Sequence, residues 1–196
     1  MTIGISLDDV IRDFLTKFKS VYKKEFEKDP IEPINTYDLL THFPFESQEE
    51  INTFLYEDFS LELFGHSNEK YKNVVIDLNK LYETYKENYK FLIISKEFGN
   101  SIPSTMFFLS KTSCKLRDYK FVTSNYDVWE HCDVMITANP EILNSVPKEK
   151  IVVKVKTEYN QNISSTYEVE KLKNILDENL LSNIFNTKII SYTNIE

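Results

Sequence analysis

The stretch Ile3-Gly4-Ile5-Ser6-Leu7-Asp8-Asp9-Val10 decides the predicted fold, because an apolar run passes here into a polar loop. Residues 2–6 form a short apolar run, which is typical of a buried strand. A helical pattern follows at once, with apolar residues at three- and four-residue spacing: Ile11, Phe14, Leu15, Phe18, Tyr22 and Phe26. A strand that leads directly into a helix is the repeating unit of α/β folds.

The same alternation continues along the chain. Apolar runs predict four further strands, at residues 91–94, 120–122, 133–136 and 151–153. Helical spacing predicts one helix from Val74 to Tyr85, one with Pro103 in its first turn, and a last helix carrying Val169, Leu172, Ile175, Leu176 and Leu180. Right-handed crossovers would join these strands in parallel. We therefore predict a three-layer, Rossmann-like parallel sheet of five strands.

Residues 30–70 interrupt this pattern and are too long for a single crossover connection. Ser47, followed by two acidic residues, has the features of a helix start, and Gly65 is expected to end that segment. We predict an α/β core from residues 1–29 and 71–196, with residues 30–70 as a small helical, cap-like insertion. Its aromatic residues are expected to hold it to the core, or else to form an exposed patch for a partner: Tyr56, Phe59, Phe64 and Tyr71.

Composition narrows the classes of function. The chain has 196 residues, 41% of them hydrophobic, which suits one packed domain, and its net charge of −8 disfavours binding to nucleic acid. We expect no signal peptide, and no stretch reaches the roughly 20 apolar residues of a membrane helix. Cys114 and Cys132 are expected to be reduced, buried thiols of a cytoplasmic protein. With three glycines, neither GxGxxG nor a P-loop can be built, and the scattered histidines do not suggest zinc.

Ligands of open parallel sheets bind beyond the carboxyl ends of the strands. In this chain those ends lie at residues 6–10, 95–99, 123–125 and 137–140. Residues 3–10 resemble the first motif of the haloacid dehalogenase superfamily, and Ile93-Ile94-Ser95 resembles the second. Residues 133–141, with Asn139-Pro140-Glu141, are similar to the fourth motif as found in the C-type 5'-nucleotidase, or 5'(3')-deoxyribonucleotidase, branch.

This resemblance implies a chemistry, and with it the positions that matter. In the family, a first aspartate attacks phosphorus, a second acts as general acid and base, and magnesium is held by the first aspartate, a backbone carbonyl and an acid of the fourth motif. Here Ser6 stands at the nucleophile position, whereas Asp8 keeps the acid/base position. Ser95 keeps the hydroxyl of the second motif.

The remaining positions of the resemblance have changed. The lysine of the third motif should lie near Ser124 or Asn125, and the acids of the fourth motif fall at Thr137 and Ala138. Asp133 cannot replace them, because four residues of strand place it about 13 Å away. Glu141 reaches the pocket only if its loop folds back.

Two other interpretations concern charged residues near the motifs. Lys96 and Lys111 lie outside the motif position, although either could supply a cation. Asp8 and Asp9 could simply cap a helix that starts near Val10.

The favoured hypothesis is a non-catalytic protein that uses this fold as a binding, structural or assembly module, without metal or cofactor. It would take a protein partner or join a larger complex. The resemblance, with the richness in Lys, Asn and Ile, suggests a phage-encoded and virion-associated protein. The alternative is a residual magnesium-dependent phosphatase, or a nucleotide-binding protein, acting on nucleoside monophosphates through Asp8 and Ser95. Ligand sensing without catalysis is a third hypothesis.

Overall fold

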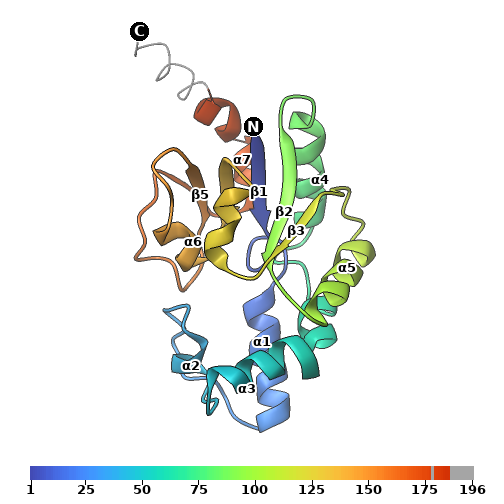
Figure 1. Cartoon of the computed structure of the whole chain (residues 1–196), viewed down its shortest axis with the longest axis vertical. Coiled ribbons are helices and arrows are strands. Elements are labelled where there is room, and N and C mark those ends of the chain that lie inside the picture. Colours follow the sequence, from blue (N-terminus) through green and yellow to red (C-terminus); the bar gives the residue numbers. More distant parts are fainter. Residues whose placement is uncertain (178, 186–196) are drawn as a thin grey trace.

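A computed structural model describes residues 1–177 and 179–185. Its centre is one parallel sheet with the strand order β3-β2-β1-β4-β5-β6 (Figure 1). The strands are β1 (Thr2–Ser6), β2 (Lys90–Lys96), β3 (Tyr119–Val122), β4 (Val134–Thr137), β5 (Ile151–Val155) and β6 (Tyr167–Val169). The order reverses direction between β1 and β4, so that a ligand crevice is expected beyond the carboxyl ends of these two strands.

Helices cover both faces of the sheet. One face packs against α4 (Val74–Tyr85), α5 (Ser101–Lys111) and α7 (Leu172–Asp177), and this cluster includes Leu78, Phe108 and Ile175. The other face packs against the 3-10 helix η3 (Asn125–Glu130) and α6 (Pro140–Asn144), with Trp129 and Ile142 in the cluster. The predicted three-layer α/β arrangement is confirmed.

Gly4 lets β1 fit between its two neighbours. A Cβ atom at this position would lie 2.7 Å from Met135 Sδ and 2.8 Å from Ile94 Cδ1, which are side chains of the strands on either side. Close packing of this kind tolerates little added volume. The glycine in the first apolar run therefore belongs to the packing of the sheet.

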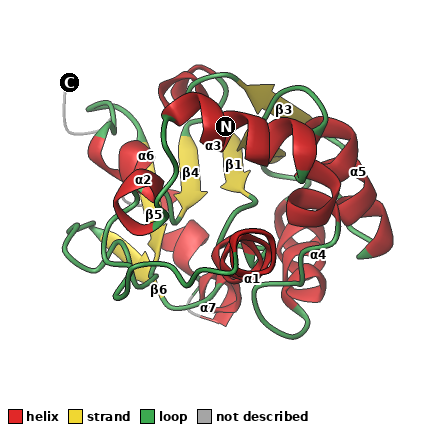
Figure 2. Cartoon of the chain, turned by 90° about the horizontal axis from the view of Figure 1, so that it is seen from below, coloured by secondary structure: helices red, strands yellow, loops and turns green. Residues whose placement is uncertain are grey.

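A second hydrophobic cluster lies beyond the carboxyl ends of the strands. It joins the long helix α1 (Phe14–Phe26) to a region built from α2 (Leu39–His42), α3 (Gln48–Thr53) and the π-helical turns η1 (Phe54–Asp58) and η2 (Leu61–Gly65). Figure 1 shows α1, α2 and α3 below the sheet, and Figure 2 shows the same helices from below, in front of the strand ends. Phe18 is at the centre of the cluster, with its ring 4.4 Å from Phe43 and 5.8 Å from Phe54.

Several predicted elements agree with the structure. Ser47 caps α3 by accepting a hydrogen bond from Glu50 N at 3.1 Å, and Gly65 ends η2. Tyr56 and Phe64 are buried in the second cluster, so these two hold the segment in place and form no exposed patch. Both cysteines are free and buried.

Three expectations about the elements were wrong. The sheet has six strands because residues 167–169 form β6, so Val169 belongs to a strand and not to the last helix. That helix is α7, and helical residues 180–185 follow it, while residue 178 lies outside the described residues. The first helix begins at Phe14, because residues 8–12 form a loop that bridges back on itself.

Among residues 1–177 and 179–185, no helix combines the length and apolar character needed to cross a membrane.

Candidate functional site

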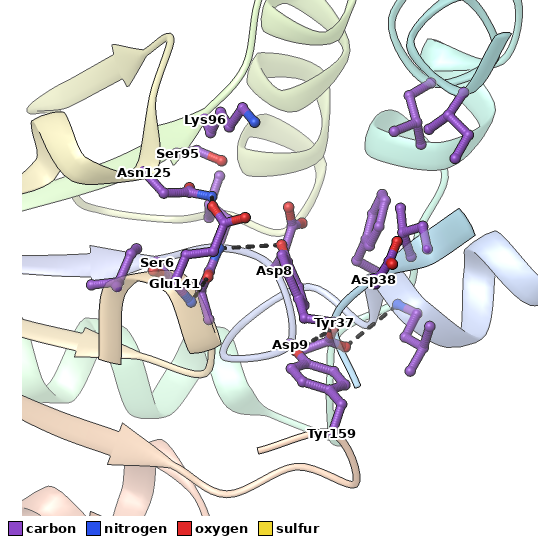
Figure 3. Close-up of a pocket in the computed structure, with 18 of the residues that line it drawn as sticks. Ser6, Asp8, Asp9, Tyr37, Asp38, Ser95, Lys96, Asn125, Glu141 and Tyr159 are labelled. Carbon is purple, nitrogen blue, oxygen red and sulfur yellow. Dashed lines mark hydrogen bonds between the residues drawn. The ribbon is translucent and has the colours of Figure 1, made fainter. Parts of the chain in front are cut away.

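A cavity of about 340 Å³ lies at the edge of the sheet where β1 and β4 end. Its floor comes from the strand ends and the loop after β1, and its opposite wall comes from α1 and from residues 34–56. This volume is at the lower end of the range of small-molecule sites. Figure 3 shows the polar side chains that project into it.

Ser6 and Thr137 pair with each other at the ends of β1 and β4. Ser6 Oγ donates a hydrogen bond to Thr137 Oγ1 at 2.8 Å, and both side chains are buried. Thr137 Oγ1 also accepts a hydrogen bond from Asn139 N at 3.1 Å. A serine becomes nucleophilic when a base withdraws its proton. Here the proton of Ser6 points to a neutral hydroxyl and not to a base.

Asp8 is held by a buried arginine. Arg12 Nε and Nη2 both lie 2.7 Å from Asp8 Oδ1, and Nη2 lies 2.8 Å from Glu97 Oε1. Nη1 donates to Thr105 Oγ1 at 2.5 Å and to Phe64 O at 3.3 Å. Every nitrogen of the guanidinium group therefore has a partner, and the group is fixed between the loop after β1, the end of β2, α5 and η2.

Glu97 completes this network from the end of β2. Its Oε1 atom also accepts a hydrogen bond from Ser95 Oγ at 2.9 Å, whereas its buried Oε2 atom has no partner among the described residues. Burial raises the pKa of Glu97, Arg12 lowers it, and the negative charge of Asp8 raises it further. Two carboxylates that share one guanidinium group thus give the network an excess of negative charge.

Asp9 has its own set of partners and a left-handed backbone with φ of 57°. Its carboxylate accepts hydrogen bonds from Lys70 Nζ at 3.0 Å, from the hydroxyl of Tyr159 at 2.9 Å and from Leu15 N at 3.4 Å. Burial raises the pKa of Asp9, although Lys70 opposes this shift. The expected capping of a helix near Val10 was wrong for both residues, because no helix starts there: Asp8 binds Arg12, and Asp9 contacts the first turn of α1 through Leu15 N.

Polar residues of the fourth-motif segment form the other side of the cavity. Asn125 Nδ2 donates to Glu141 Oε2 at 2.6 Å, and Asn139 Nδ2 donates to the hydroxyl of Tyr37 at 3.2 Å. Asn139 also caps α6 through Glu141 N. Tyr37 comes from residues 30–70, so this contact joins that segment to the sheet edge (Figure 3).

The structure brings most of the candidate residues together. Ser6, Asp8, Ser95 and Asn125 all line the cavity, as do Lys96 and Glu141. Glu141 was expected to reach the pocket only through a folded loop, and helix α6 directs it there. Thr137 and Ala138 are fully buried, and neither lines the cavity.

Two other candidates lie elsewhere. Asp133 precedes β4 at the opposite end from Thr137 and accepts a hydrogen bond from Thr2 N at 2.9 Å. Lys111 donates to Ser67 O at 3.0 Å. Neither residue lines the cavity, which agrees with the expectation that Asp133 cannot replace the missing acids.

The donors at this sheet edge do not fit magnesium, which prefers several oxygen ligands with octahedral geometry. Asp8 Oδ1 is taken by Arg12, the hydroxyl groups of Ser6 and Thr137 bind each other, and Ala138 offers no side-chain oxygen. In the part of the chain that the structure describes, no group of three His, Cys, Asp or Glu side chains is placed to hold a metal ion.

Sequence reasoning missed Arg12, Glu97, Tyr37, Tyr56 and Tyr159 as residues of this site. Glu97 could have been found, because it lies two residues after Ser95 and side chains two apart on a strand point to the same face. Tyr159 could not, since it meets Asp9 across a sequence separation of 150 residues.

No protein-family description matches this sequence, and no curated protein matches it. A solved structure does: a protein from Burkholderia xenovorans LB400 described as a haloacid dehalogenase-like hydrolase. The TM-score is 0.55 at 11% sequence identity, and the match covers 90% of this chain and 94% of that one. The chain therefore has the fold of haloacid dehalogenase-like hydrolases. A match at this low sequence identity supports the fold and says nothing of the activity.

Proposed function

We propose that the chain is a non-catalytic protein that uses a haloacid dehalogenase-like fold as a binding module. The observation that carries this proposal is the pairing of Asp8 with the fully buried Arg12. An acid/base residue must exchange a proton with a reacting group. Asp8 instead serves, together with Glu97, as a counter-ion to the permanently charged and fully buried Arg12.

The rest of the sheet edge supports the same proposal. Among the described residues, the hydroxyl of Ser6 bonds the hydroxyl of Thr137 and no base, and the positions at which the resemblance implies metal-binding acids are Thr137 and Ala138. Phosphoryl transfer relies on cations that stabilise the charge of the transferred group. The cation nearest to Asp8 is Arg12, whose nitrogens are already occupied.

The binding role extends, in this proposal, to a protein partner in a larger assembly, and a phage origin stays a sequence-based hypothesis. Size-exclusion chromatography of the chain from its native source tests this part. A stable complex of defined mass is expected, and a monodisperse monomer would count against it.

The second candidate is a residual phosphatase or nucleotide-binding protein, as the sequence also suggested. It is favoured by one observation, which is that Asp8 and Ser95 line the same cavity. Asp8 retains a partly exposed side chain there, so that a ligand can reach it.

Phosphatase assays with Mg²⁺ separate the two candidates. We expect no release of phosphate from nucleoside monophosphates above the blank, either by the natural chain or by the Asp8→Asn variant. Thermal unfolding of each protein would establish that it is folded. Turnover by the natural chain that disappears in Asp8→Asn would overturn the non-catalytic proposal.

A further inference from the structure

We propose that the cavity binds a small organic cation, with a primary ammonium or guanidinium group, and not a phosphate ester. This inference rests on the proposed non-catalytic function and names its ligand class. It is carried by the charge of the cavity wall, by the aromatic side chains that enclose it, and by a largely buried tyrosine of the lining whose hydroxyl group has no hydrogen-bond partner among the described residues.

The charge of the wall is predominantly negative. Four carboxylate side chains line the cavity, and the cationic side chain among the lining residues is the exposed Lys96; the carboxylates are Asp8, Asp9, Asp38 and Glu141. In Figure 3 the carboxyl groups of Asp8, Asp38 and Glu141 project into the same space. At the distances within such a cavity, like charges repel a phosphate dianion and opposite charges attract a cation.

The ion pairs that Arg12 and Lys70 form with the lining carboxylates do not remove the excess of negative charge. Arg12 balances Asp8 but shares its single charge with Glu97, and Lys70 balances Asp9 but shares its charge with Asp13 at 2.8 Å. Each internal cation therefore serves two carboxylates. Arg12 also has no nitrogen left to bind a ligand oxygen, so an entering phosphate would find no buried cation to receive it.

Tyr56 points to a ligand independently of the acids. Tyr56 is 9% exposed and lines the cavity, yet its hydroxyl group makes no hydrogen bond within the described residues. Burial raises the pKa of Tyr56, and the negative charges of Asp8 and Glu97 raise it further. The phenol stays neutral, and its oxygen can accept a hydrogen bond from an ammonium or guanidinium group.

The aromatic wall suits the same class of ligand. Tyr37 and Tyr159 line one side, with ring centroids 5.4 Å apart, and Phe14 and Tyr56 line another. The ring of Phe64 beside them is already covered by Arg12, whose Cζ lies 4.7 Å from the ring centroid. Ring faces attract cations, most strongly where water is excluded. Burial raises the pKa of Tyr37 as well, and the charges of Asp8, Asp9 and Glu141 add to that shift, which reports the same negative surroundings.

Isothermal titration calorimetry of the whole chain at low salt tests the proposal, with agmatine and spermidine as cationic probes and inorganic phosphate and adenosine monophosphate as anionic ones. We expect binding of at least one cationic probe and of neither anion. The double variant Asp38→Asn, Glu141→Gln removes two wall charges that bind no buried cation. Its affinity should fall by about tenfold, because two of the four wall carboxylates that attract the cation are lost.

Two further variants sharpen the test. Tyr56→Phe removes only the unpaired hydroxyl and should weaken binding of the cation by about threefold or more. Glu87→Gln removes one negative charge, half of what the double variant removes, from an exposed residue outside the lining, and it should leave the affinity unchanged. These variants separate a local contact from the net charge of the protein.

Several results would overturn the proposed class of ligand. Absence of binding by both cations, an unchanged affinity in the Asp38→Asn, Glu141→Gln protein, or tighter binding of phosphate than of either cation would each do so. Binding of adenosine monophosphate without turnover would reject the cationic ligand and leave the non-catalytic proposal standing. Turnover in the phosphatase assay would reject the non-catalytic proposal itself.

Discussion

Arg12 is fully buried although it carries a permanent charge. Removing one partner of a buried ion pair leaves the others uncompensated and costs about 3–5 kcal/mol. We therefore expect Arg12→Ala to lower the free energy of unfolding by that amount in urea denaturation. Arg12→Lys should recover only part of the loss, since one ammonium group cannot reach all of Asp8, Glu97, Thr105 and Phe64 O.

A surface ion pair supplies the control for Arg12. Lys23 Nζ lies 2.7 Å from Asp29, and both side chains are largely exposed. Lys23→Ala should change the free energy of unfolding by less than about 1 kcal/mol. Equal losses in Arg12→Ala and Lys23→Ala would show that the buried network is not what stabilises this region.

Glu97 makes stability depend on pH in a defined direction. Its folded-state pKa is raised from the ordinary value of 4.5, mainly through burial. Above that value the unfolded chain releases the proton first, so the folded chain binds more protons and the free energy of unfolding falls as the pH rises. This contribution is present at acidic pH and is lost as the pH passes through the folded-state pKa.

The Glu97→Gln variant lacks this titration and reveals it by difference. The stability of the natural chain minus that of the variant should decrease as the pH is raised from about 4.5, and then level off. Urea unfolding curves at several pH values measure the difference. A difference that increases over the same range would contradict the raised pKa.

At the scale of elements, helix α4 shows which side chains stabilise the fold. Leu78 is fully buried against the sheet, whereas Ile76 on the same helix is 51% exposed. Leu78→Ala should cost about 2–5 kcal/mol of unfolding free energy, because it removes buried apolar contacts and leaves a cavity. Ile76→Ala should stay within about 0.5 kcal/mol. Comparable losses in denaturant unfolding would mean that α4 does not pack as described.

Some helices and strands could be predicted from the sequence pattern, and others could not. The helix from Val74 to Tyr85 was predicted with its observed bounds, because its apolar residues repeat at helical spacing on one buried face. β6 was missed because it has three residues, too few for a period, and Val169 also fits the helical spacing of α7. The start of α1 was placed too early because Val10 and Ile11 are buried in a loop, where burial mimics the periodicity of a helix.

At the scale of the molecule, the boundary of the cap-like unit can be compared with the two large hydrophobic clusters, one against the sheet and one around α1. The sequence predicts residues 30–70, yet α1 packs in the cluster of residues 34–64 and not in that of the sheet. We propose that α1 belongs to the same cooperative unit as that segment. Regions with separate cores often open separately in hydrogen exchange.

Phe43→Ala tests this division, since Phe43 is fully buried in the second cluster. Its loss of about 3–5 kcal/mol should speed amide exchange in α1 and α3 while Ile3, Ile5 and Ile93 keep their protection. Leu78→Ala, in the sheet cluster, should instead speed exchange throughout. Protection of α1 that follows the sheet in Phe43→Ala would place the boundary after α1, near residue 29.

The sequence by itself determined the α/β class, five of the six strands and the positions at the strand ends where a site would form. Hydrophobic periodicity and turn residues are local properties of the sequence, so these features can be predicted from short segments. Only the tertiary structure decided how those positions are used. Glu97 and Tyr159 reach the loop after β1 from distant parts of the chain, and Arg12 turns back onto Asp8 within that loop. Asp8 therefore looked like a residual acid in the sequence, and in the fold it is the partner of a buried cation in an acidic cavity.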